Sequence, residues 1–289
     1  MKKYILITLF LAGTIVAALS CKKSFTVRNP YQLADANMAY LKIVHASPNF
    51  GTIWGKPDSF NIFINGAKVN GTFLSYNGVF PTAVYQASPG IANTYFAVQP
   101  GAVQIKLTVP GTGANTDSLA IMSVTKNLVG GKLYSYILTD SIKAVRDSAQ
   151  MFVQDNFTSA LPGYVNLRFA HAVLNDTAGT TVDVFSYARN TTIFTKIKPD
   201  SVTSFQLLGF NIQSLDTFYA TRTPATSSTP LSGRTILAKM IFTGNAILSN
   251  PSAPAQGAAN LRTFTLYYKG DGNLTSGTRA RALTSYINQ

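Results

Sequence analysis

The chain of 289 residues is patterned mainly in short runs in which hydrophobic and polar residues alternate. Residues 103–109 read Val-Gln-Ile-Lys-Leu-Thr-Val, and residues 132–138 and 262–268 are short runs rich in aromatic residues. Because neighbouring side chains of a strand point to opposite faces, such runs predict strands with one buried face. No long run has the 3.6-residue period of an amphipathic helix. The pattern therefore predicts an all-β protein.

One such strand is written twice, around the only two histidines. The stretch LKIVHASPN holds His45, and LRFAHAVLN holds His171, 126 residues later (171 − 45). In this alignment Lys42 meets Arg168, and apolar residues flank both. The histidines share a face with the apolar residues, whereas the two basic residues point the other way. We therefore predict a half-buried strand in two copies, with Lys42 and Arg168 on its polar face.

A second predicted strand follows in both halves. Residues 60–63 read FNIF and residues 182–185 read VDVF, so Asn61 aligns with Asp183. In the first half the run continues into Asn65-Gly66, which is a strong signal for a tight β-hairpin. Each half offers roughly six to eight short strands, a number typical of a Greek-key sandwich. We predict two tandem Ig-like (Greek-key) β-sandwich domains, residues 38–141 and 163–289, joined by a linker, residues 142–162, that ends in a strand.

The N-terminus has the pattern of a secretory signal. Residues 1–20 have two lysines followed by an apolar stretch of about 16 residues, which is short for a bilayer span of about 20. The single cysteine, Cys21, follows Ala18-Leu19-Ser20, a sequence that resembles the lipobox of bacterial lipoproteins. That resemblance implies that the Cys21 thiol is acylated and becomes the new N-terminus. Residues 21–37 then form a tether; a free thiol after ordinary signal cleavage is the alternative.

Charge and composition narrow the function classes. The formal net charge is +13, all 11 acidic residues are Asp, and 24 residues are Lys or Arg. An excess of this size can attract nucleic acid, anionic lipid or acidic glycan. The basic residues are scattered, however, and no zinc-finger spacing or basic helix accompanies them, so we predict no nucleic-acid partner.

The first half resembles a bacterial family known as domain of unknown function 4397. The resemblance rests on VHASPN followed by FNIFING, where the family has Val-His-Ala-Ser-Pro-Asp and Val-Asp-Val-Tyr-Val-Asn-Gly. Asn49 and Asn61 stand where the family has Asp. The second half keeps His171 and Asp183 but lacks the Ser-Pro and Asn-Gly pairs. The resemblance implies an Ig-like fold in a lipoprotein or cell-surface protein and implies no activity.

The histidines have a structural and a functional interpretation. Imidazole is suited to metal binding and to general base catalysis. One histidine per domain lacks the ligand cluster of a zinc site, and each lies on an apolar face, so the structural interpretation is favoured. His45 with Asn61, and His171 with Asp183, are possible structural pairs, although alternation turns Asn61 and Asp183 away from the core. We predict no metal site; the Asx residues of 175–176 and 271–273 are read as turn formers rather than Ca²⁺ ligands.

Trp54 is the only tryptophan and lies in an insertion that the second half lacks. It would stack on a sugar or anchor a partner if exposed, and it would close the end of the sandwich if buried. The burial interpretation is favoured.

No catalytic signature is present in the sequence. We find no His-Glu-x-x-His, no Walker loop and no Gly-x-Ser-x-Gly elbow, and no cofactor is expected. The sequence therefore predicts a non-enzymatic lipoprotein anchored to the outer membrane, with a binding or scaffolding role. Its expected partners are the membrane, through the lipid, and a glycan or envelope proteins. The alternatives are an accessory glycan-binding lipoprotein of a polysaccharide-uptake system and an enzyme whose Asp and His groups converge in a cleft.

Overall fold

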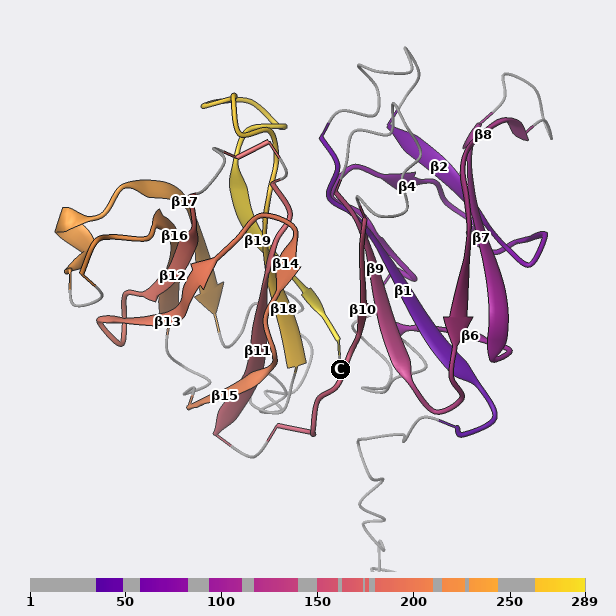
Figure 1. Ribbon diagram of the computed structural model, residues 1–289, viewed down its shortest axis with the longest axis horizontal. Coiled ribbons are helices and arrows are strands. Elements are labelled where there is room, and N and C mark those ends of the chain that lie inside the picture. Colours follow the sequence, from indigo (N-terminus) through magenta and orange to yellow (C-terminus); the bar gives the residue numbers. More distant parts are fainter. Residues whose placement is uncertain are drawn as a thin grey trace, which may run out of the picture. The chain divides into compact units, whose positions relative to one another are not determined.

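The computed structural model confirms the all-β sandwich fold (Figure 1). Tyr31–Gln289 form one compact unit. Cys21, Asn49 and Trp54, the expected signal and nearly all of the expected tether lie outside the described residues. No helix within the described residues has the length and hydropathy needed to span a bilayer. The described residues are 35–48, 58–82, 94–110, 117–139, 150–160, 163–173, 175–176, 180–209, 215–226, 229–243 and 263–288.

The first half consists of two facing sheets. One sheet has the order β10-β9-β1-β5, with β6 also paired to β1. The other has the order β3-β2-β7-β8, with β4 also paired to β2. The strands are β1 (Ala39–His45), β2 (Ser59–Ile64), β3 (Ala67–Lys68), β4 (Leu74–Ser75), β5 (Val79–Phe80), β6 (Phe96–Val98), β7 (Gly101–Pro110), β8 (Asp117–Leu128), β9 (Leu133–Leu138) and β10 (Met151–Gln154).

The second half has the same strand order. One sheet is β14-β11-β18-β19, with β15 also paired to β11, and the other is β13-β12-β16-β17. The first strand of each half runs parallel to a late strand, β1 with β9 and β11 with β18. The strands are β11 (Tyr164–His171), β12 (Val182–Ser186), β13 (Thr191–Ile197), β14 (Ser201–Val202), β15 (Gln206–Gly209), β16 (Leu215–Arg222), β17 (Ile236–Thr243), β18 (Thr263–Lys269) and β19 (Ala282–Ile287), with a short 3₁₀ turn η2 (Leu231–Gly233) before β17.

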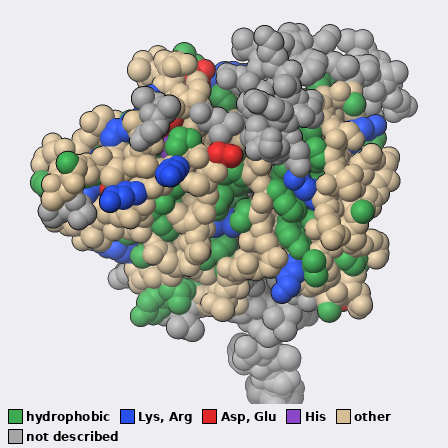
Figure 2. Space-filling model, viewed as in Figure 1, with side chains coloured by type: hydrophobic (Ala, Val, Ile, Leu, Met, Phe, Trp, Pro, Cys, Tyr) green, Lys and Arg blue, Asp and Glu red, His purple; other side chains and the backbone are tan. Residues whose placement is uncertain are grey.

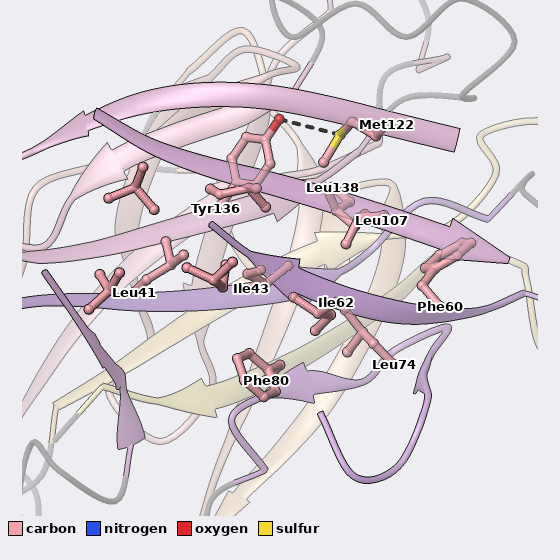
Figure 3. Packing of buried hydrophobic residues seen from close by; sticks show 14 of the residues in the cluster. Leu41, Ile43, Phe60, Ile62, Leu74, Phe80, Leu107, Met122, Tyr136 and Leu138 are labelled. Atoms are coloured by element: carbon pink, nitrogen blue, oxygen red, sulfur yellow. Dashed lines mark hydrogen bonds between the residues drawn. The ribbon is translucent and has the colours of Figure 1, made fainter. Parts of the chain in front are cut away.

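Each half has its own hydrophobic core between its two sheets. In the first core, Leu41 and Ile43 of β1 meet Phe60 and Ile62 of β2 (Figure 3). The hydroxyl of Tyr136 lies 3.5 Å from a methionine sulfur in the same core. The second core repeats this arrangement with residues of β11, β12, β16 and β18. The apolar face predicted for the first strand is therefore the core face in both halves.

The Asn-Gly hairpin is confirmed. Asn65 and Gly66 have φ angles of 49° and 83°, and β2 turns directly into β3 through them. Two consecutive positive φ values match a type I′ turn, in which glycine and asparagine avoid the steric cost that other residues would have. The sequence pattern thus located this turn correctly.

The expected linker contributes a strand to the first half. β10, within residues 142–162, pairs antiparallel with β9 as an edge strand of the first sheet. The residues that follow it lead to β11 and include Asp155, which is 3% exposed. This part of the chain is therefore structural rather than a free connector.

The prediction of a half-buried strand is wrong. All seven residues of β1 are buried, and Lys42 and Arg168 are each 1% exposed. The face that alternation marks as polar is covered because the first sheets of the two halves pack on each other. An apolar cluster joins them, with Val44 and Ile137 from one half and Ala170 and Tyr267 from the other. β1 and β11 are thus central strands that are covered on both faces.

Candidate functional site

The most elaborate side-chain cluster described lies between the two halves and is centred on Arg168. One terminal nitrogen of its guanidinium lies 2.6 Å from the carboxylate of Asp155, and both side chains are almost completely buried. Its Nε donates a hydrogen bond of 2.8 Å to Thr265, the neighbour of Arg168 on β18. The ring of Phe205 lies 4.5 Å from the guanidinium carbon. Asp155, from the end of the first half, therefore holds the first strand of the second half.

Asp155 also accepts hydrogen bonds from neutral donors. The hydroxyls of Tyr95 and Ser135 each donate to its Oδ2 at 2.6 Å. Asn288, near the C-terminus, donates to the Tyr95 hydroxyl at 2.8 Å and lies 3.4 Å from the same carboxylate oxygen. A buried carboxylate requires compensation of this kind, because desolvation disfavours its charged form.

Lys42 occupies the position in β1 that Arg168 occupies in β11, but its partners are different. Its ammonium donates to the main-chain carbonyl of Ile287 at 2.7 Å and to that of Thr94. The Tyr95 ring lies 4.4 Å from the same nitrogen. Lys42 thus connects β1 of the first half with β19 of the second half.

Burial alters the ionisation of this cluster. Desolvation lowers the pKa of Lys42 to about 7, partly offset by Asp155 and reinforced by Arg168. Burial is the largest single influence on Arg168 and opposes its charge, but Asp155, Tyr286 and Tyr95 together outweigh it, so the pKa of Arg168 lies above its ordinary value. Burial, with Asp155 nearby, raises the pKa of Tyr95 well above its ordinary value. At neutral pH Arg168 is therefore charged, whereas Lys42, with a pKa of about 7, is partly deprotonated.

A second polar contact joins the halves near His45. Arg279, from the loop before β19, forms an ion pair with Asp58 of the first half and donates to the carbonyl of Pro48. Lys269 donates to the hydroxyl of Tyr76 at 3.2 Å, and the Tyr267 hydroxyl donates to Asn77 at 2.7 Å. The interface thus has polar contacts on both sides of its apolar cluster.

His45 is completely buried at the end of β1. Its ring lies 4.9 Å from that of Phe60 and 5.9 Å from that of Tyr76. Burial, together with the charges of Arg279 and Lys269, lowers the pKa of His45 to about 3. The imidazole is therefore neutral at physiological pH.

His171 is also completely buried, and it packs edge-on against Tyr268 with ring centroids 5.1 Å apart. Its Nε2 lies 3.4 Å from the carboxylate of Asp176. Arg222 donates a hydrogen bond of 2.7 Å to Asp176. The guanidinium of Arg281 lies 3.7 Å from the same carboxylate. The carboxylate is therefore shared with arginines.

The structure does not bring His171 together with Asp183. β11 and β12 belong to different sheets, and the carboxylate of Asp183 accepts from the main-chain nitrogen of Lys196, from Thr223 and from Arg234, at 2.8, 2.6 and 3.0 Å. Lys196 has a φ of 54° and lies next to a register shift in β13. Asp183 therefore stabilises an irregular edge strand.

Asn61 occupies the corresponding position in the first half. It lies opposite Thr108 of β7, as Asp183 lies opposite Thr221 of β16, and all four side chains are buried. β1 and β2 belong to different sheets, and the ring of Phe60, the neighbour of Asn61, lies 4.9 Å from that of His45. The proposed His–Asx pairs thus do not arise from neighbouring strands in either half.

The two loops weighed as Ca²⁺ sites contact each other. Asn175 donates to Asp271 at 2.6 Å and accepts from the nitrogen of Gly272 at 2.8 Å. Asp271 also caps the nitrogen of Asn273 at 2.9 Å, which is ordinary turn chemistry. Within the described residues, no group of three or more His, Cys, Asp or Glu side chains is placed to hold a metal ion.

Sequence reasoning missed Asp155, Tyr95 and Asn288. None of the three lies in a run with strand periodicity that marks it as part of a site. One feature of the sequence could have indicated them: a basic residue, Lys42 or Arg168, stands at the same position of the apolar first strand in each half. Two buried cations would need acceptors, and that requirement points to a buried carboxylate elsewhere in the chain.

Residues 39–178 match the model of a domain of unknown function, DUF4397. This DUF4397 match begins at β1 and extends past β11, so it contains both His45 and His171. It confirms the family resemblance for this span, which includes the expected linker and the first strand of the second half. No curated protein matches the chain.

Two solved structures show weak similarity. A leucine-rich repeat protein from Bacteroides thetaiotaomicron is 13% identical, with 71% of this chain and 24% of that chain covered and a TM-score of 0.18. A proposed cell-adhesion protein from Bacteroides uniformis is 12% identical, with 87% of this chain and 98% of that chain covered and a TM-score of 0.17. The chain thus spans about a quarter of the first structure, and scores this low do not establish a shared fold.

Proposed function

We propose that this protein is a non-enzymatic lipoprotein of the outer membrane that binds or scaffolds other envelope components. The proposal combines the leader and Cys21, which predict export and lipid attachment, with the two joined sandwiches. The second half would be a divergent copy of the DUF4397 unit, since both halves have the same strand order and the same His and Asx positions.

The observation that carries the proposal is the use of the buried charged groups. Arg168 and Asp155 pair with each other, and the ammonium of Lys42 is bonded to two main-chain carbonyls. Catalytic groups need access to a substrate and a protonation state poised for transfer. The charged groups instead hold the two sandwiches together, which favours a rigid binding protein. Loops on the sandwiches would then contact the partner.

Lipid attachment is tested on the full chain in a bacterial host. We expect labelled palmitate to be incorporated and the protein to fractionate with outer membranes. Cys21→Ser should abolish both, while a control such as Ser24→Ala should leave both unchanged. Equal labelling of the wild type and Cys21→Ser would contradict the anchor.

The binding role is tested with the labelled soluble chain from Ser24 on isolated cell envelopes. We expect saturable binding that is lost after protease treatment of the envelopes, as a protein partner predicts. Loss after periodate oxidation instead would favour the glycan-binding alternative, and a Trp54→Ala variant then tests whether the tryptophan contributes. Absence of saturable binding to all envelope preparations would refute the binding role.

A further inference from the structure

A groove of about 680 Å³ opens between the two halves, beside the Arg168–Asp155 pair. Gly131 to Leu133 and the segment from Asp155 to Thr158 line it from the first half, and Asn166, Phe205 and Leu207 line it from the second. Its volume lies within the range of roughly 300–1,000 Å³ that is usual for small-molecule sites, which often lie between domains. Figure 2 shows hydrophobic side chains in the central part of one face, with Lys and Arg side chains among them.

Part of the wall of the groove is apolar. The rings of Phe157 and Phe205 meet edge to face, with centroids 5.2 Å apart, and Leu133 is part-buried beside them. Leu207 is 41% exposed although it lies in a strand. An exposed leucine next to two aromatic rings provides apolar area that a ligand of matching shape would bury.

The only available charge among the described residues that line this groove is positive. The Asp155 carboxylate is occupied by Arg168, Tyr95 and Ser135 and is 3% exposed, so it offers no free negative charge. Lys132 is exposed at the rim, and no carboxylate of the described residues pairs with it. Asn156 and Thr158, also exposed, add polar groups at the same rim. A ligand would therefore meet an apolar wall, one cation and several hydrogen-bonding groups.

We propose that this groove binds a small soluble amphiphile that has an apolar body and an anionic head such as a carboxylate. The apolar body lies against Phe157, Phe205 and Leu207, and the anion lies at Lys132. The inference rests on the proposed function, for which it names a ligand class. Its test uses the purified chain alone, so its outcome is independent of the envelope experiment.

The test measures binding of decanoate to the soluble chain from Ser24 by titration calorimetry. Decylammonium, with the same chain and the opposite charge, is the comparison probe. We expect decanoate to bind saturably at one site and decylammonium to bind roughly two- to fivefold more weakly, the scale of one exposed charge contact. Lys132→Met should remove this preference. Leu207→Asp, at an exposed position, should weaken decanoate binding further by adding a negative charge to the apolar wall.

Lys239→Met is the matched control, because Lys239 is an exposed lysine on β17, in a different sheet of the second half, and it should leave binding unchanged. Phe205→Ala is avoided because Phe205 also covers Arg168. No saturable decanoate binding, equal binding of the two probes, or decanoate binding unaffected by both Lys132→Met and Leu207→Asp would overturn the proposal. The proposal would also be overturned if the protein sedimented with anionic phospholipid vesicles but did not bind decanoate, since it would then recognise a lipid surface.

Discussion

The two halves place a cation at the same position of the same strand, and they satisfy it differently. Arg168 faces a carboxylate and retains its charge, whereas Lys42 faces two carbonyls and has its pKa lowered to about 7. A guanidinium is almost never neutral, so a buried arginine requires an anion; an amine can lose its proton instead. The comparison shows that the same strand position in the two halves can hold a fixed ion pair in one half and a titratable group in the other.

The largest expected effect comes from removing the anion. Asp155→Ala leaves Arg168 buried without its counter-charge and removes the acceptor of Tyr95 and Ser135. Breaking a buried pair from one side typically costs about 3–5 kcal/mol, because an uncompensated charge remains in the interior. We expect a loss of this size in the free energy of unfolding, measured by urea denaturation.

Asp35→Ala is the control for this experiment. Asp35 is exposed and accepts hydrogen bonds from Asn37, so its loss should change stability by no more than about 0.5 kcal/mol. Equal effects of the two substitutions would show that the Asp155–Arg168 pair does not hold the halves together.

Lys42 should make stability depend on pH. Its folded pKa is about 7 and its unfolded pKa is near 10.5, so the unfolded state binds more protons between these values. Stability should therefore rise as the pH increases from about 7 to 9.5, by up to about 3 kcal/mol. The rise ends near pH 9.5 because of Tyr95, whose pKa is raised by burial. At higher pH this tyrosine ionises in the unfolded state before it does in the folded state, which lowers the stability.

Lys42→Met should reduce this rise, most clearly between about pH 7 and 8, as measured by urea denaturation at several pH values. Part of the rise remains above about pH 8, because burial lowers the pKa of Lys269 to about 8 and this lysine acts in the same sense. The pH dependence in acid provides an internal check. Because the pKa of His45 is lowered to about 3 in the folded state, this group stabilises the fold above its unfolded pKa. That contribution should be lost in both proteins as the pH falls from about 6.5 towards 3. A wild-type profile that stays flat between pH 7 and 9.5 would refute the assignment to Lys42.

Much of the fold could be predicted from alternation, but the interface could not. The pattern at residues 41–45 shows which side chains share a face, and it found the core face correctly. It does not show whether another sheet covers the opposite face, so Lys42 and Arg168 looked solvent-exposed. Edge strand β13 was missed because only Phe194 of its seven residues is buried, which leaves no clear alternation. The site was missed because Asp155 acts through tertiary contact rather than through a local pattern.

A smaller effect tests whether the shape of the cation matters in the second half. Arg168→Lys retains the charge near Asp155 but loses the Nε bond to Thr265 and the planar contact with Phe205. We expect a loss of about 1.5–3 kcal/mol in the free energy of unfolding, the scale of a hydrogen bond to a charged group. The double variant Arg168→Lys with Thr265→Val should cost less than the sum of the two single variants, because the bond between Arg168 and Thr265 is lost only once. The bond of 2.7 Å that Thr265 donates to Asn288 is lost with Thr265→Val in either background. Full additivity of the two substitutions would contradict this account.

The smallest effect compares a glycine of each half. Gly66 has a φ of 83° in the hairpin between β2 and β3, and a Cβ built there meets no atom within 4 Å. Gly66→Ala should therefore cost about 1 kcal/mol purely from the backbone conformation. Gly209 is not in the positive-φ region, and its added Cβ would lie 3.9 Å from Tyr164, so Gly209→Ala should be close to neutral. Urea denaturation of both variants checks the difference; equal losses would contradict the claim that the positive φ angle of the hairpin determines the cost at Gly66.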